Sequence, residues 1–385
     1  MPKTIFEKNF FENKAALLSL FKLMDLLTEG QAQQIAELPN SAYLEEMNRL
    51  GQKYLIRNGK ERGDENNTGL LARIFPELKQ DATALAAKAQ LLENSIKSLG
   101  VFAEKKPAAA MSEYGYISFF GGFAFRVKTR LNAAVQLLND NSDLKPQALI
   151  LITGVRNLDV HRESDYLERG ITTELMMVQD VVAQYKKEGK LPEDLAVVTI
   201  LGEKPAGAAR SDTSHGILAF KAWLEAHPEM AKTRGLGFSN APYIDYQGEQ
   251  AASCLQGSYD FEVVGPAENL TATLPPLDAK PAQGFWPLGD SLLVDALDSV
   301  ARTSYALKAK LDYQQGLQAQ AQAQKEKLEA ETLRAVAAPS YLPTQAVYLE
   351  KEKVRLNAEA EPPATQAASA AASSAHHAKP KLGKL

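Results

Sequence analysis

The sequence has 385 residues, 45% of them hydrophobic, and a formal net charge of −4 at pH 7. This length allows two or three domains with a sizeable core, and the acidic balance argues against sequence-independent nucleic-acid binding, which needs a basic face. The one cysteine, Cys254, excludes a disulfide within the chain and fits a reducing compartment. No stretch has the roughly 20 apolar residues that span a bilayer, and the N-terminal residues make a poor secretory signal. We therefore expect a cytoplasmic protein without a transmembrane segment.

Residues 1–110 are predicted to form a helical region, because apolar side chains recur there at spacings of three and four. Three such stripes occur, at 17–27, 44–54 and 85–96. A polar loop with a glycine near each end, residues 57–69, separates the second stripe from the third.

Residues 111–287 are predicted to form a Rossmann-like, doubly wound α/β domain with a mainly parallel, five-stranded sheet. Short apolar runs alternate there with helical patterns, which implies βαβ units with right-handed connections. Each run is nearly continuously apolar, so we expect strands buried on both faces. The runs are Tyr116–Phe120, Ala148–Ile152, Ala196–Leu201, Gly235–Phe238 and Phe261–Val264. The helical patterns cover Val127–Leu138, Glu174–Tyr185, Gly216–Leu224 and Glu249–Leu255, and a proline-rich linker occupies 266–287.

Residues 288–337 are predicted to form one long helix, capped by Asp290-Ser291, whose amphipathic first half packs on the domain. Its polar second half favours helix by composition and offers a surface for a protein partner. Residues 338–385 are rich in alanine and proline and are predicted to be disordered. The Glu-rich stretches at 326–331 and 350–361 suggest an alternative function, that of a non-enzymatic interaction protein such as a secreted bacterial effector with a C-terminal export signal.

The candidate ligand site lies in the loops after the strands, because open parallel sheets bind ligands outside the carboxyl ends of their strands. Gly121 and Gly122 follow the first strand and let a ligand approach the backbone, and Arg126 adds charge near a helix N-terminus that favours anions. No G-x-G-x-x-G fingerprint is present. Gly154 and Arg156 follow the second strand.

The loop from Arg156 to Thr173 is long and polar, which is typical of a lid or binding element or of a solvated charged loop. Glu174 then begins a helix, either as a favourable first-turn acid or facing the site. Glu203 directly follows the third strand, where a carboxylate is placed for ribose hydroxyls, a metal or acid–base chemistry.

Asp212 and Thr213 form a helix-capping signature after the third strand, and Asn240 and Tyr243 follow the fourth. The two strand-end histidines, His161 and His215, match no metal-ligand spacing, so we predict no metal site. A nucleophile elbow is also absent. These residues favour a small-molecule ligand and specify no reaction.

The order of these motifs resembles the YdcF/SanA/ElyC-like family of bacterial proteins over residues of about 113–266. The resemblance rests on Gly121-Gly122 before a helix with Arg126, Thr153-Gly154, Thr173-Glu174, and Glu203 followed by Ser211-Asp212-Thr213. It implies a Rossmann-like fold that binds a nucleotide-like ligand, S-adenosylmethionine or another adenine nucleotide. The chain departs from the family at His215-Gly216, where the family has an asparagine, and at Tyr243–Gln247, where it tends to have a histidine and an arginine.

Overall fold

The computed structural model describes residues 5–55, 82–160, 162–203, 212–267, 292–337, 350–353 and 355. The predicted polar loop at 57–69, the proline-rich linker beyond residue 267, the Asp290-Ser291 cap and most of the tail lie outside the described residues. The chain divides into two compact units, residues 1–311 and 312–385. Within the described part, no helix is long and apolar enough to cross a membrane.

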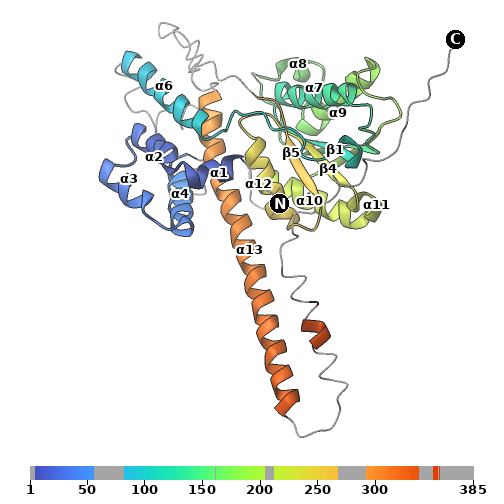
Figure 1. Ribbon diagram of the computed structural model, residues 1–385. Coiled ribbons are helices and arrows are strands. Elements are labelled where there is room, and N and C mark those ends of the chain that lie inside the picture. The colour runs from blue at the N-terminus through green and yellow to red at the C-terminus, as the bar shows by residue number, and fades with distance from the viewer. Residues whose placement is uncertain are drawn as a thin grey trace, which may run out of the picture. The chain divides into compact units, whose positions relative to one another are not determined.

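The centre of the first unit is a five-stranded, all-parallel sheet with the strand order β3-β2-β1-β4-β5 (Figure 1). The chain runs outward from β1 through β2 to β3, then crosses to β4 on the other side of β1. The predicted doubly wound α/β fold is therefore confirmed, and each strand falls on a predicted apolar run. The strands are β1 (Tyr114–Phe120), β2 (Ala148–Thr153), β3 (Ala196–Leu201), β4 (Arg234–Phe238) and β5 (Phe261–Val264).

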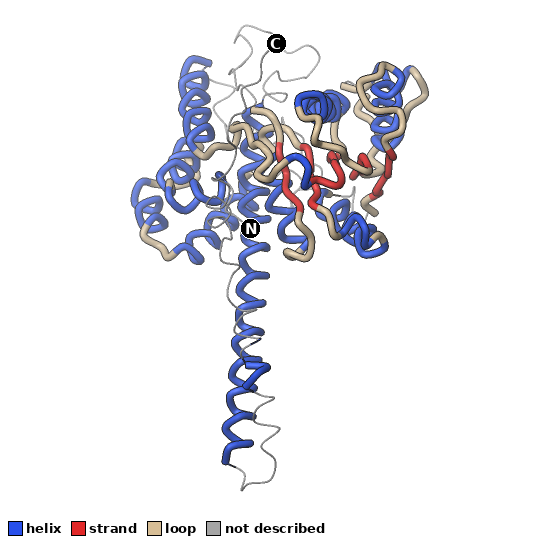
Figure 2. The backbone as a smooth tube through the Cα atoms, turned by 45° about the vertical axis from the view of Figure 1, so that its right-hand side comes forward, coloured by secondary structure: helices blue, strands red, loops and turns tan. Residues whose placement is uncertain are grey.

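Helices cover both faces of this sheet, as Figure 2 shows from a second direction. One face carries a core in which Ile117 and Leu149 of the strands pack with Val127 and Val181 of the helices. This arrangement follows from the strand pattern, because runs that are apolar at every position must bury both faces. The helices on this side are α7 (Ala124–Asp140), α8 (Ser164–Glu168) and α9 (Glu174–Lys187).

The opposite face is covered by helices that share one continuous core with the N-terminal helices. Tyr116 and Ile150 of the sheet, Phe220 beside them, and Phe10 and Leu92 from the N-terminal region all belong to this core. The predicted helical region therefore packs onto the α/β domain. Its helices are α1 (Ile5–Glu12), α2 (Lys14–Leu23), α3 (Glu29–Ala36), α4 (Asn40–Tyr54) and α6 (Ala82–Ser98), followed by the 3-10 turn η2 (Met111–Glu113); the helices over the sheet are α10 (Thr213–Ala226), α11 (Pro228–Ala231) and α12 (Ile244–Leu255).

The long C-terminal helix α13 (Leu292–Ala337) enters the same core with its first turns, as predicted. Leu297 and Val300 are buried there. Lys310 then donates hydrogen bonds to Glu7 of α1 at 2.6 Å and to Glu249 of α12 at 2.8 Å. This buried triad joins three helices that lie far apart in the sequence. Residues 312–337 continue the helix in the second unit, and a protein partner for them stays a prediction.

Two local expectations are wrong. Strand β3 is not buried on both faces: Val197 is 39% and Leu201 37% exposed, whereas Phe261 of the other edge strand, β5, is 4% exposed. The segment from Arg156 to Thr173 is not an open polar loop either. It contains α8, and Glu163 and Tyr166 are buried within it.

Candidate functional site

A cavity of about 230 Å³ lies at the carboxyl ends of β1 and β2, on the side where the chain crosses to β4. The loops after the neighbouring strands β1 and β4 lead to helices on opposite faces of the sheet, and such a divergence leaves a crevice between them. Segments from six parts of the first unit line it. They are 120–123 with Arg126 and Arg130, 152–154 with Arg156, Glu174, 212–213 with Gly216, Tyr243 with 246–247, and Asp295, Asp298 and Arg302 of α13.

The Glu174 carboxylate forms the floor of the cavity next to the first strand. Its Oε1 accepts hydrogen bonds from the Thr153 hydroxyl at 2.9 Å and the Gly154 amide at 3.3 Å. A Cβ atom at position 121 would overlap this same oxygen, so a larger residue there would have to displace the Glu174 carboxylate. Gly122 also has a φ of 155°, a value that favours glycine. The absence of a side chain at Gly121 thus lets the Glu174 carboxylate lie against the end of β1.

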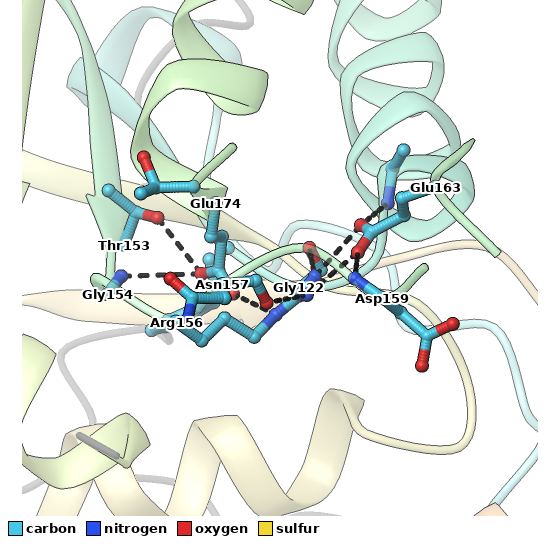
Figure 3. Close-up of polar contacts among 12 residues, drawn as sticks. Gly122, Thr153, Gly154, Arg156, Asn157, Asp159, Glu163 and Glu174 are labelled. Carbon is cyan, nitrogen blue, oxygen red and sulfur yellow. Dashed lines mark hydrogen bonds and ion pairs between the residues drawn. The ribbon is translucent and has the colours of Figure 1, made fainter. Parts of the chain in front are cut away.

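Arg156 links the carboxylates of Glu174 and Glu163, as Figure 3 shows. Its Nε lies 2.6 Å from Oε2 of Glu174, and its Nη1 lies 2.8 Å from Oε2 of Glu163. A further bond runs from Nη2 to the Gly122 carbonyl at 2.8 Å. Burial opposes the charge of this guanidinium, but Glu163 and Glu174 hold the pKa of Arg156 above its usual value. Arg156 therefore stays charged and holds the two carboxylates and the Gly122 carbonyl together.

Glu163 occupies the N-terminus of α7, where an anionic ligand was a natural expectation. Its Oε1 accepts the amide of Ala124 at 3.0 Å, and its Oε2 accepts the amide of Asp159 at 2.9 Å. The side chain is completely buried. A carboxylate of the protein itself therefore already satisfies the first amide of this helix.

Arg130 and Asn240 form a buried support behind the first strand end. The guanidinium donates to the carbonyls of Phe120 at 2.5 Å and Gly121 at 2.6 Å, and its Nε donates to Oδ1 of Asn240 at 2.8 Å. Arg130 is only 2% exposed. These contacts fix the path of the backbone through the glycine pair.

Arg126 faces the cavity from the first turn of α7 and is 6% exposed. Its Nη2 pairs with Oδ2 of Asp295, and its guanidinium lies 4.8 Å from the ring centre of Tyr243. The Tyr243 hydroxyl donates to the other Asp295 oxygen at 2.9 Å. The Nη1 of Arg126 is buried and has no hydrogen-bond partner among the described residues.

The α10 side of the cavity begins with a capped helix end. Asp212 accepts the amide of His215 at 3.1 Å and the hydroxyl of Ser214 at 2.5 Å. Burial raises the pKa of Asp212, but these hydrogen bonds bring it below the usual value. Thr213 hydrogen-bonds to Tyr246, whose own pKa is raised by burial. The predicted capping role of Asp212 is confirmed.

Close backbone packing brings α10 to the strand ends. A Cβ at Gly202 would lie 2.7 Å from the amide nitrogen of Gly216, and a Cβ at Gly216 would lie 2.8 Å from a methyl carbon of Ile152. Two glycines at this contact therefore let the helix N-terminus reach the cavity.

Helix α13 adds a second ion pair to the cavity wall. Nε of Arg302 lies 2.7 Å from Oδ2 of Asp298, whose side chain is 1% exposed. Burial works against the charge of Arg302, but Asp298 raises its pKa above the usual value. A third cavity-wall residue, Gln247 of α12, is 5% exposed, and its Oε1 is buried without a partner among the described residues.

The structure brings most of the predicted site residues together. Those that line the cavity are Gly121, Gly122, Arg126, Gly154, Arg156, Glu174, Asp212, Thr213 and Tyr243. Two do not line it: Glu203 is exposed beyond the end of β3, and Asn240 is buried behind the site against Arg130.

The lining residues outside the predicted set include residues near the predicted glycines and helix ends, namely Phe120, Phe123, Arg130, Ile152, Thr153 and Gly216. The others come from α12 and α13: Tyr246, Gln247, Asp295, Asp298 and Arg302. The last three are spaced by three and four residues in a half-helix that is otherwise mostly apolar, and this polar stripe was the signal available. His161 and Ser211 lie outside the described residues. Among the residues that are described, no group of three or more His, Cys, Asp or Glu is arranged to hold a metal ion.

Comparisons with known protein families, with curated proteins and with solved structures find no match to this chain.

Proposed function

We propose that the protein binds a small, nucleotide-like or other anionic molecule in the cavity at the strand ends. The observation that carries this proposal concerns Arg126, which lines the cavity and whose Nη1 atom, a charged donor, is buried without a hydrogen-bond partner among the described residues. Leaving a buried charged donor unpaired costs about 1–3 kcal/mol or more. A ligand oxygen that accepts this hydrogen bond removes the cost.

The position and size of the cavity support a ligand site. It lies at the topological switch between β1 and β4, where open α/β sheets bind their ligands. Its volume of about 230 Å³ is just below the ~300–1,000 Å³ typical of sites for drug-sized molecules. A ligand of mononucleotide size or smaller matches this volume.

The wall chemistry supports a ligand with both a planar apolar part and polar groups. Four aromatic side chains line the cavity, Phe120, Phe123, Tyr243 and Tyr246. Such rings stack on nucleobases and other planar groups. The resemblance to the YdcF/SanA/ElyC-like family adds S-adenosylmethionine and adenine nucleotides as probes.

The proposal is one of binding and names no reaction. A general acid or base needs a group within reach of the substrate proton. The cavity carboxylates are held by protein donors instead: Glu174 by Arg156, Asp212 by its helix amide, Asp295 by Arg126 and Asp298 by Arg302.

Thermal unfolding with adenine nucleotides and S-adenosylmethionine tests the proposal. A ligand at about 100 times its Kd stabilises the folded state by about 2.7 kcal/mol, which raises the Tm by several degrees. Arg126→Gln is expected to abolish the shift. The control Arg169→Gln removes an exposed arginine that pairs with Asp180 on α9 and is expected to keep it. If no probe shifts the wild type, or if Arg126→Gln shifts equally, the proposal fails.

A further inference from the structure

We infer that the group bound by Arg126 is a monoanion, and that Asp295 of α13 is the residue that limits its charge. This inference rests on the proposed function, since it concerns the ligand of the same cavity. It narrows the ligand class to molecules that carry a hydrogen-bond donor and one negative charge, such as a carboxylate or a phosphodiester, and disfavours phosphomonoesters and polyphosphates.

Among the described residues that line the cavity, positive and negative side chains are equal in number. Its cations are the arginines at 126, 130, 156 and 302, and its anions are Glu174, Asp212, Asp295 and Asp298. Sites for polyphosphates need a surplus of positive charge or a bound cation to neutralise several oxygens. A balanced wall has no such surplus.

The three cavity arginines other than Arg126 are committed to the protein. Arg156 holds Glu163 and Glu174. Arg302 holds Asp298. Arg130 donates to two backbone carbonyls and to Asn240. Their positive charges stabilise the fold of the loops and have protein partners already.

Arg126 differs because its guanidinium is divided between the protein and the cavity. Nη2 pairs with Asp295, and Nη1 is left over. Tyr243 fixes this arrangement from two sides, since its hydroxyl holds the Asp295 carboxylate and its ring lies 4.8 Å from the guanidinium. The ligand therefore meets one donor without a partner among the described residues, Nη1, on an arginine whose charge Asp295 already partly neutralises.

A second negative charge on the ligand would meet Asp295 at this point. Like charges at close range in a partly buried site repel strongly, because little water screens them. A monoanion avoids this repulsion and still satisfies Nη1. The Asp295 carboxylate thus takes the interaction with Arg126 that a second negative charge on the ligand would need.

Gln247 adds a hydrogen-bond acceptor to the lining of the cavity. Its Oε1 is buried without a partner among the described residues. An acceptor in this state needs an N–H or O–H donor from the ligand. A hydroxyl or amino group on the same ligand as the monoanion meets this need.

Titration calorimetry with matched ligands tests the inference. Adenosine, cyclic AMP, AMP and ADP share one nucleoside and carry an increasing negative charge. Dimethyl phosphate and methyl phosphate repeat the comparison of monoanion and dianion without the nucleoside. The wild-type protein is expected to bind the monoanion of each series most tightly. In Asp295→Asn, AMP and methyl phosphate are expected to bind at least about tenfold more tightly than in the wild type, with a much smaller change for the monoanions.

The outcomes separate this inference from the proposed function. Asp143→Asn, at an exposed position, controls for the loss of one negative charge and is expected to leave the order of affinities unchanged. If wild-type affinity rises from cyclic AMP to ADP and is lost in Arg126→Gln, the proposed function stands and the monoanion inference is overturned. If no ligand of either series binds the wild type, both are overturned. The wild-type order alone decides the matter should Asp295→Asn fail to fold.

Discussion

Asp245 is a buried carboxyl group of α12 whose replacement tests the electrostatics of the first unit. It lies in the first turn of α12 and is 8% exposed. Burial raises the pKa of Asp245 from 3.8 to about 6; the nearby Lys105 opposes this shift and Glu249 adds to it. Asp245→Asn keeps the size of the side chain and removes the titration.

The magnitude follows from the difference in pKa between the folded and unfolded states. An acid with a raised folded-state pKa binds its proton more tightly in the folded protein than in the unfolded chain. Protonation of Asp245 therefore adds its full contribution to the free energy of unfolding below pH 3.8, and this contribution is lost as the pH rises through about 6. A shift of about two units corresponds to about 3 kcal/mol. The stability of Asp245→Asn relative to wild type is therefore expected to increase by up to about 3 kcal/mol between about pH 4 and pH 7.5.

Urea denaturation across this pH range measures the effect. Trp223 supplies a fluorescence signal from the first unit, because its ring stacks on Phe220 of the core. The exposed Asp143→Asn variant is the control and is expected to follow the wild type at every pH. A stability difference between Asp245→Asn and wild type that stays constant within about 1 kcal/mol would refute the reasoning.

Two further substitutions probe contacts around the cavity and the core. Gly121→Ala is expected to lower the stability by about 1–3 kcal/mol and to weaken ligand binding, because the added Cβ overlaps Oε1 of Glu174; urea denaturation and ligand titration measure the two effects, and an unchanged midpoint contradicts the close approach. Lys310→Met is expected to cost about 3–5 kcal/mol in urea denaturation, because Glu7 and Glu249 lose their buried cation. A cost as small as that of a surface pair, below about 1 kcal/mol, would mean that water reaches the triad.

The strands were predictable because their signal is local. Ala196–Leu201 and Phe261–Val264 have the predicted bounds, and the other strands differ by one or two residues at their ends. The error at β3 has a non-local cause. Its run of apolar residues resembles that of β2, but the elements that pack on a strand decide whether its faces are covered, and β3 is more exposed than the other edge strand, β5. No pattern within six residues contains that information.

The loop residues of the site were predictable for a geometric reason. In a parallel sheet the carboxyl ends of all strands meet at one edge, so Gly121, Gly154 and Thr213 had to lie close together. Glu203 was expected there by the same rule and lies outside the cavity. It follows the edge strand β3, whereas the cavity lies over β1 and β2, so the distance across the sheet separates them.

The decisive pair of the site, Arg126 and Asp295, lies beyond what strand-end reasoning reaches. The two residues are separated by the whole α/β domain in sequence and meet only because α13 packs back across the strand ends. Their polar positions are visible in the sequence, but an Nη1 without a partner among the described residues is not, since it depends on where the acceptors from other elements lie. In the site that we propose, the Asp295 carboxylate takes one side of the Arg126 guanidinium and so limits the negative charge that a ligand can carry. That proposed role depends on the tertiary fold, because it needs α13 to line the cavity as well as to enter the core.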